Sequence, residues 1–560
     1  MDKRTIFAFI LIGLIIILYP HYMEWIMGPE IPVPPPEPIP AERMRTSPFP
    51  PPDQPAVPAE IVPEAPRVAA TEQTASRSAP GEFTPTDVIV ETDLFTATFS
   101  TRGGVLTQLL LKAYEHPDGG QLDLIAPGSN ALGLSLAGEP LDAHEFSTDT
   151  PRLTLVGAEQ AELIFRSDVG TRTIEKRIRF QGNRYRADMA VAVSGLQPQE
   201  KLGVGWSGSL ADTENNLEEN ALYMSVVTRA GGEVETWNVE DLGPDGDPPP
   251  GGRISWVGIR NKYFLVAMIP PEGSYGLDMA GDMRDIAEWY EVEILSKVVD
   301  PGQRYGVYFG PISYDRLRQQ NQDLSGNYRE LEMEEFMEYG FAIFRPIIKP
   351  ITNLNLRAFL ALHPLIPNYG LVIIVFSVLI KIVVFPLTHK SLEAAAKMQQ
   401  LQPRIAAMRE KYPDDQQKVS REMMKLYKEE GVNPLGGCLP MVIQMPILFS
   451  LFNVFRGAIE LRQSEFVFWI TDLSQPDRLY IGGFEIHLLP LLMAVSTFVQ
   501  SKMTMKDPKQ AFMVYIMPVF MTWIFWSMSS GLVLYWTMFN VLTILQQQVM
   551  ERVKRVLGTR

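Results

Sequence analysis

The stretch from Gly370 to Leu387 reads GLVIIVFSVLIKIVVFPL and contains a single charged residue, Lys381. As a helix it would be about 27 Å long, close to the thickness of the hydrocarbon core of a bilayer. A lysine at that depth costs roughly 2.5 to 3.5 kcal/mol, so such residues usually face protein or water and serve a function. Ser377 lies one turn earlier on the same face of this helix.

Position alone leaves two interpretations of Lys381 open. It lies about 9 Å from the end of the helix at Leu387, so its stem could extend much of the way to the interface. Lys381 is then either a tolerated, snorkelling lysine or a functional charge inside the membrane.

Four further apolar stretches follow and predict a bundle of five spans. They run from Cys438 to Phe455, Ile486 to Gln500, Phe512 to Met528 and Gly531 to Val549. The stretch that begins at Ile486 would be only about 22 Å long. A span this short predicts local thinning of the bilayer, which would lower the barrier to moving polar segments through lipid.

The loops predict the orientation of the spans. Residues 388–437 contain nine Lys or Arg, whereas residues 458–485 contain two basic and five acidic residues. The positive-inside rule places the basic loops and the C-terminal tail in the cytoplasm. Residues 388–437 also read as a helical hairpin, with a turn at Tyr412 to Asp415, that is either a docking surface or a connector.

The region before these spans has a different composition. Residues 1–339 contain 27 basic and 51 acidic residues, against 23 and 14 in residues 340–560, which indicates two compartments. We expect a transmembrane anchor at residues 1–27 with a cytoplasmic N-terminus, although a cleaved signal peptide would begin similarly. The fifteen prolines of residues 28–70 predict an extended spacer, so residues 28–84 are expected to be a periplasmic linker.

Residues 85–330 predict an all-β sandwich domain on the far side of the membrane. Val88 to Phe99 and Thr171 to Val193 alternate apolar and polar residues, and glycine-rich turns such as Arg102-Gly103-Gly104 punctuate the region. Residues 331–369 then form a connector. Its apolar residues from Glu332 to Lys349 recur at helical spacing, which predicts an amphipathic helix at the membrane surface or one packed on the β domain.

No enzyme or cofactor motif is present in the sequence. The one cysteine, Cys438, excludes an internal disulfide, and the six scattered histidines lack metal-ligand spacing. There is no phosphate-binding loop, and the negative charge of the first half argues against direct nucleic-acid readout. We therefore expect a protein that is not an enzyme and that needs no cofactor.

Polar residues inside the spans predict a hydrated groove. Trp536, Asn540, Thr543 and Gln547 form one stripe on the last span, with Tyr535 beside it. Interhelical hydrogen bonding is the simpler explanation for each polar residue alone. Together with Lys381, they define a set of candidate groove residues: Lys381, Ser377, Gln444, Tyr535, Trp536, Asn540 and Thr543.

Several motifs resemble the YidC membrane protein insertase family, in order and with matching spacing over roughly residues 330–550. They are NPLGGCLP at 433–440 with Gln444-Met445-Pro446, ELRQ at 460–463, FWITDLS at 468–474, SGLVLYW at 530–536 and Gln546-Gln547-Gln548. The anchor and β domain resemble the Gram-negative form. The resemblance implies a membrane protein of the bacterial inner membrane. Its expected fold is an anchor helix, a periplasmic β-supersandwich and, at 370–560, an α-helical core of five transmembrane helices.

The resemblance also implies a function. Such proteins insert and fold nascent membrane proteins, alone or beside the Sec translocon and its accessory subunits, in contact with the ribosome and membrane lipid. A positive residue in a hydrophilic groove attracts polar parts of the nascent chain, and Lys381 occupies that position. The family more often has arginine there, and arginine stays charged whereas a buried lysine can lose its proton. We expect a hydrated groove to keep Lys381 charged. The short tail after Val549 argues against extensive tail-mediated ribosome binding.

Two other function classes remain open at this stage. A small-molecule transporter with a β-rich sensor domain would favour internal repeats of spans, and none is visible. A structural scaffold that only docks other translocation proteins predicts that Lys381 can be replaced by alanine without loss.

Overall fold

The computed structural model describes most of the chain after Glu82. The described residues are 83–195, 200–243, 252–271, 274, 276–284, 287–296, 304–323, 331–337, 344–413, 415–431, 439–504 and 511–556. The expected N-terminal anchor, almost all of the proline-rich linker and Cys438 lie outside them.

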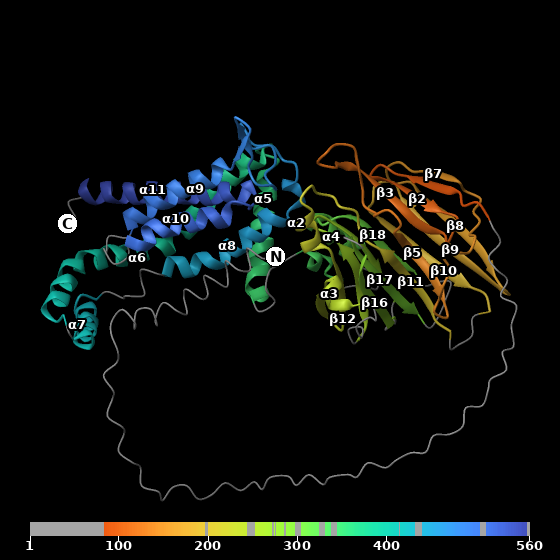
Figure 1. The fold of residues 1–560 in the computed structure, drawn as a ribbon, viewed down its shortest axis with the longest axis horizontal. Helices are drawn as coiled ribbons and strands as arrows, with labels where there is room; N and C mark the ends of the chain where they lie inside the picture. Colours follow the sequence, from red (N-terminus) through yellow and green to blue (C-terminus); the bar gives the residue numbers. More distant parts are fainter. Residues whose placement is uncertain are drawn as a thin grey trace, which may run out of the picture. The chain divides into compact units, whose positions relative to one another are not determined.

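The first part of the described chain is a β domain of two sheets (Figure 1). In spatial order, the first sheet contains β16 (Gly276–Arg284), β17 (Ala287–Ser296), β11 (Leu202–Gly208), β5 (Asn130–Leu136), β3 (Val105–Glu115), β2 (Phe95–Ser100), β1 (Asp87–Glu91) and β7 (Arg152–Thr154). Two short strands extend it, β4 (Gln121–Asp123) beside β3 and β6 (Glu139–Pro140) beside β5. Among the strands that the structure describes, all of its pairings are antiparallel except that of β1 with β7.

The second sheet is antiparallel throughout the described residues. Its order is β13 (Glu233–Trp237), β12 (Ser225–Ala230), β14 (Ile254–Arg260), β15 (Phe264–Ile269), β18 (Tyr305–Pro311), β10 (Arg186–Val193), β9 (Arg172–Gln181) and β8 (Gln160–Val169). Buried residues of both sheets form one hydrophobic core. The predicted all-β domain is confirmed, and each of the two predicted alternating runs folds as a β-hairpin.

Three strands of the second sheet are buried on both faces. Every residue of β12, β15 and β18 is buried, whereas β2 and β9 alternate between buried and partly exposed residues. Short helices accompany this domain: α2 (Leu217–Tyr223), α3 (Val239–Leu242), α4 (Tyr314–Asp323) and the 3-10 helix η1 (Met333–Phe336).

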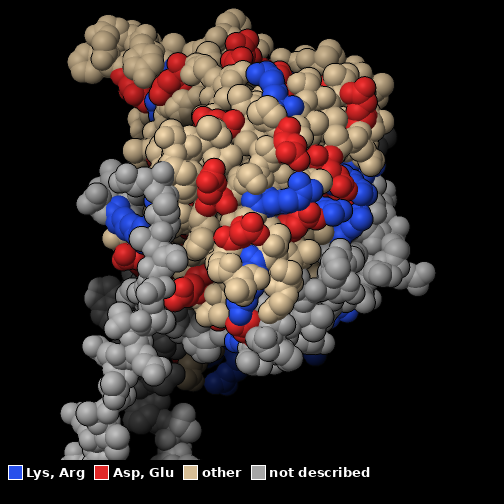
Figure 2. Space-filling model, turned by 90° about the vertical axis from the view of Figure 1, so that its right-hand side faces the viewer, with Lys and Arg blue, Asp and Glu red and all other residues tan. Residues whose placement is uncertain are grey.

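Charged side chains of both signs share the outer surface of the β domain (Figure 2). Strands β8 and β9 carry cross-strand ion pairs, for example Arg166 with Glu175 at 2.9 Å and Arg179 with Glu162 at 2.5 Å. Such exposed pairs typically contribute less than about 1 kcal/mol each. Because the signs alternate, this face is neither continuously acidic nor continuously basic, although the first half of the chain is acidic overall.

The predicted helix from Glu332 to Lys349 is not continuous, so that prediction is wrong. Met333 and Phe336 belong to η1 and are buried in the core of the β domain. The Trp256 indole donates a hydrogen bond to the Leu331 carbonyl at 2.7 Å, and its ring lies 4.0 Å from that of Phe336. The apolar residues at the start of the pattern therefore pack on the sheet, and the next described helix begins only at Arg345.

The second part of the described chain is helical. Its helices are α5 (Arg345–Leu362), α6 (Tyr369–Lys411), α7 (Gln416–Glu429), α8 (Leu439–Gly457), the 3-10 helix η4 (Ile459–Leu461), α9 (Leu488–Thr504), α10 (Ala511–Phe525) and α11 (Ser530–Val556). A small hairpin, β19 (Leu479–Ile481) and β20 (Phe484–Ile486), precedes α9, so this helix starts two residues after the predicted Ile486. All five predicted apolar stretches contain a helix. Within the described residues, no helix has both the length and the hydropathy needed to cross a membrane.

The helices share a core of their own. Buried residues of α5, α6, α8, α9 and α11 pack together, among them Phe359, Phe376, Phe455 and Tyr535. The predicted helical hairpin is also present: α6 continues without a break to Lys411, and α7 packs back on it through Leu401, Ile405 and Leu426. The helical bundle thus holds α6 and α11 against each other, which positions Lys381.

Candidate substrate groove

Lys381 lies on α6 and reaches α11. Its Nζ donates a hydrogen bond to Thr543 Oγ1 at 2.7 Å and lies 4.0 Å from the centre of the Phe539 ring. The Thr543 hydroxyl donates a hydrogen bond to the Phe539 carbonyl at 2.7 Å, so its oxygen lone pairs can accept from the lysine. Both partners of the amine are therefore neutral.

No carboxylate pairs with Lys381 among the residues that the structure describes. The side chain is half-buried between two apolar helices. A hydroxyl and an aromatic face hold a cation in place without cancelling its charge. The site is therefore able to attract an acidic or polar group.

A second contact joins α8 to α11 through two further candidate residues. The Gln444 side-chain amide lies 3.5 Å from the Tyr535 hydroxyl, at the limit of a hydrogen bond. Tyr535 is buried, and its ring lies 5.8 Å from that of Phe455 and 6.2 Å from that of Phe539. The aromatic contact from Tyr535 to Phe539 connects this pair to the surroundings of Lys381.

Trp536 is half-buried, and its ring lies 5.4 Å from that of Phe525 on α10. It thus faces the α10 side of α11. Among the described residues, no hydrogen bond or cation–π contact joins Trp536 to Lys381.

Two predicted groove residues have other partners. Ser377 is fully buried and donates to the Ile373 carbonyl of its own helix at 2.7 Å. Asn540 is buried too, and its amide donates to Ser496 and Thr497 on α9, at 3.1 and 2.8 Å. The predicted polar stripe of α11 therefore divides: Thr543 meets α6, and Asn540 meets α9.

Ser496 and Thr497 were missed by the sequence reasoning. Each hydroxyl donates back to the Met493 carbonyl and accepts from Asn540. An adjacent Ser-Thr pair within an apolar helix was the available signal, because buried hydroxyls in such helices need partners.

Comparison with known proteins covers both parts of the chain. Residues 87–354 match the family model described as the YidC periplasmic domain, and residues 361–556 match the model of the 60Kd inner membrane protein. A membrane protein insertase YidC of Chlorobium luteolum is 35% identical over 515 residues, which cover 86% of this chain and 85% of the relative. The chain belongs to the YidC membrane protein insertase family.

Other members of the YidC family agree over nearly the full length. The membrane protein insertase YidC of Chlorobaculum parvum is 33% identical over 582 residues, which cover 98% of this chain and 94% of the relative. A crystal structure of an active YidC insertase with its first transmembrane domain resolved matches at a TM-score of 0.36 and 17% identity, covering 83% of this chain and 93% of that one. The two family models and the curated relatives confirm, at the level of the family, the resemblance drawn from the motifs.

Proposed function

We propose that this protein inserts and folds nascent inner-membrane proteins, and that Lys381 is the groove charge that recruits their polar segments. Family membership supports the activity. The observation that supports the role of Lys381 is its geometry, a half-buried amine whose described partners, Thr543 and Phe539, are both neutral.

In the proposed mechanism an acidic or polar segment of the nascent chain replaces Thr543 as the partner of Lys381. Two unit charges 4 Å apart interact by about 4 kcal/mol at an effective dielectric constant of 20, more than a neutral hydrogen bond contributes. The polar segment is held near the bundle while the adjoining hydrophobic segment partitions into lipid. Gln444, Tyr535 and Trp536 offer it further polar and aromatic contacts.

The proposal includes a topology. We place the helices α6, α8, α9, α10 and α11 within the inner membrane, the β domain in the periplasm, and both termini with the hairpin of α6 and α7 in the cytoplasm. The basic loops support this orientation. The hairpin would contact the ribosome, and the protein would act alone or beside the Sec translocon.

The test is complementation of an insertase-depleted Gram-negative strain by Lys381→Arg, Lys381→Ala and Lys381→Glu. Insertion of a single-span substrate with an acidic translocated tail is read by protease protection. We expect Arg to support insertion and Ala and Glu to reduce it at least about tenfold, the effect of losing roughly 1.4 kcal/mol. Lys502→Glu is the matched control, since Lys502 also lies against an aromatic ring, that of Phe498, at 6.0 Å.

Equal insertion by all three variants, at equal protein levels, would show that Lys381 only snorkels. The groove mechanism would then be wrong, whereas family membership would be unaffected. A rescue by Ala but not by Glu would mean that a negative charge is harmful there without the positive charge being needed.

A further inference from the structure

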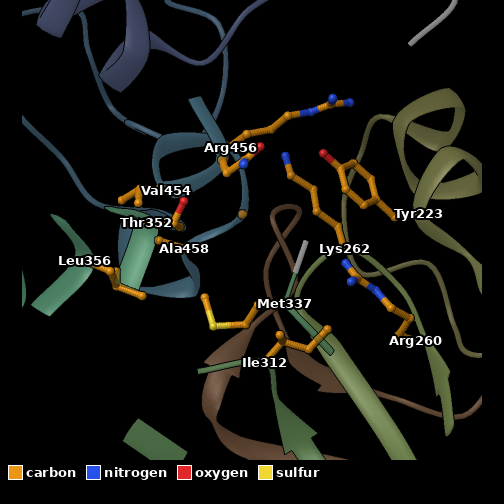
Figure 3. Close-up of a pocket in the computed structure, with 12 residues that line it drawn as sticks. Tyr223, Arg260, Lys262, Ile312, Met337, Thr352, Leu356, Val454, Arg456 and Ala458 are labelled. Atoms are coloured by element: carbon orange, nitrogen blue, oxygen red, sulfur yellow. The ribbon is translucent and has the colours of Figure 1, made fainter. Parts of the chain in front are cut away.

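A cavity lies where the β domain meets helices α5 and α8. Its empty volume is about 480 Å³ when the open solvent at its mouth is included. The β domain contributes Tyr223, Arg260 and Lys262, and the helices contribute Thr352 and Arg456 (Figure 3). The groove around Lys381 shares none of these residues.

The polar wall of this junction cavity has an excess of positive charge. Glu219 is the one carboxylate that pairs with its cations among the described residues, 3.0 Å from Lys262 Nζ and 4.0 Å from Arg456 Nε. Arg260 donates instead to the backbone carbonyls of Asn261 and Phe336, at 3.1 and 2.5 Å. Three cations thus face one paired carboxylate.

A second carboxylate that interacts with Lys262, that of Glu214, is already engaged. Glu214 forms a buried ion pair with Arg462 at 2.6 Å, so it does not neutralise the cavity. The Arg456 guanidinium lies 4.9 Å from the centre of the Tyr223 ring, and Figure 3 shows both side chains with Lys262 on one side of the cavity. This side therefore suits a ligand with a compact negative charge.

An unpartnered hydroxyl supplies an independent indication of a ligand. Thr352 lines the cavity from α5 and is only 1% exposed, yet its Oγ1 has no hydrogen-bond partner among the described residues. Buried hydroxyls are normally paired, because leaving one unpaired is unfavourable. A ligand oxygen in the cavity would give Thr352 its missing partner.

Apart from Asn453, the remaining wall is apolar, and helix α5, which forms part of it, exposes apolar side chains on its opposite face. Leu356 and Val454 line the cavity, while Ile347 and Leu354 on α5 are 58% and 68% exposed. In a member of an inner membrane protein family, such an exposed apolar helix face would be a place for lipid to make contact. The cavity therefore combines a cationic, hydroxyl-lined side with a largely apolar side, and it lies beside a helix whose opposite face is exposed and apolar.

We propose that the junction cavity binds the phosphate-bearing headgroup of an anionic phospholipid. Lys262 and Arg456 contact the phosphate, Thr352 donates to one of its oxygens, and the apolar wall receives the first carbons of the acyl chains. This inference rests on membership of an inner membrane protein family and not on the insertion activity, so either can fail without the other.

The test is native mass spectrometry of the full-length protein, released from detergent and titrated with phosphatidylglycerol, phosphatidylcholine or inorganic phosphate. The variants are Thr352→Val and Arg456→Gln. Their matched controls are Thr522→Val, whose hydroxyl already donates to the Pro518 carbonyl, and Arg404→Gln on the exposed hairpin.

We expect phosphatidylglycerol to bind more tightly than either other probe. Arg456→Gln should weaken it about tenfold and Thr352→Val about fivefold, as expected for one charged and one neutral hydrogen bond. The controls should change binding less than about twofold. Thr352→Val should leave the melting temperature unchanged or raised, because the hydroxyl that it removes has no partner, so lost binding would not reflect misfolding.

Two results would overturn the proposal. The first is binding by Thr352→Val and Arg456→Gln that equals binding by their controls. The second is inorganic phosphate that binds as tightly as phosphatidylglycerol, which would make the cavity a site for a free anion with no part for lipid.

Discussion

A buried ion pair joins the β domain to the helical part of the chain. Arg462 follows η4, and its Nε lies 2.6 Å from Glu214 Oε1, with the two side chains 2% and 1% exposed. Arg462 also donates to the carbonyls of Glu115 and Thr213, at 2.8 and 3.0 Å. We predict that Arg462→Met destabilises this junction by about 3 to 5 kcal/mol, because it leaves the Glu214 charge buried and unpaired.

The effect should depend on pH. Burial raises the pKa of Glu214, and Arg462 acts in the opposite direction. In Arg462→Met that opposing charge is gone, so the folded variant binds a proton more readily than the unfolded chain does. The loss of stability should therefore be largest at pH 8 and should shrink as the pH falls through the raised pKa of Glu214.

Hydrogen exchange of the full-length protein is the appropriate assay, since it reports local opening in a chain of more than one domain. Amides of residues 210–215 and 459–464 should lose protection by about 100-fold or more in Arg462→Met. Arg404→Met is the matched control, because its pair with Glu430 is exposed and should contribute less than about 1 kcal/mol.

The double variant Arg462→Met with Glu214→Met should recover part of the loss, because two apolar residues replace both charges. Protection in Arg462→Met that equals protection in Arg404→Met at pH 8 would refute the reasoning. So would a double variant that is no better than the single one.

Two further predictions concern stability within each part. Lys176 is fully buried and donates to the carbonyls of Gly104 and Leu132 at 2.7 and 2.5 Å. Burial lowers the pKa of Lys176 to about 7, although the charge of Asp142 acts to raise it. Between about pH 7 and 10.5 the unfolded chain therefore binds one more proton than the folded protein. The melting temperature of the wild type should rise with pH across that window relative to that of Lys176→Met. Parallel pH profiles of the two proteins would contradict this. Gly370→Ala should lower the melting temperature, because a Cβ there would lie 2.0 Å from Cδ2 of the Phe466 ring, and an unchanged value would show that the ring moves aside freely.

The sequence by itself determined the division of the chain and the type of each part. Alternating apolar residues from Val88 and from Thr171 predicted the strands, because successive side chains of a strand point to opposite faces. Continuous apolar runs around Lys381 predicted the helices, and the motifs from Asn433 onward indicated the family. These signals are local in the sequence, so they can be recognised without knowing the fold.

Only the tertiary structure decided which residues meet. Asn540 and Thr543 share one predicted face of α11, yet small differences in direction around the helix send one to Ser496 and Thr497 on α9 and the other to Lys381 on α6. Ser377 donates to its own helix, because a buried hydroxyl takes the nearest free carbonyl lone pair.

Contacts between residues far apart in the chain could likewise not be predicted from the sequence. Met333 and Phe336 fit a helical period, but burial against the β domain outweighed that local preference. Arg462 and Glu214 are 248 residues apart, and Thr352 and Lys262 share a cavity although they lie on different domains. Local sequence periodicity contains no signal for either of these contacts, because each contact depends on how two separately folded parts pack against each other.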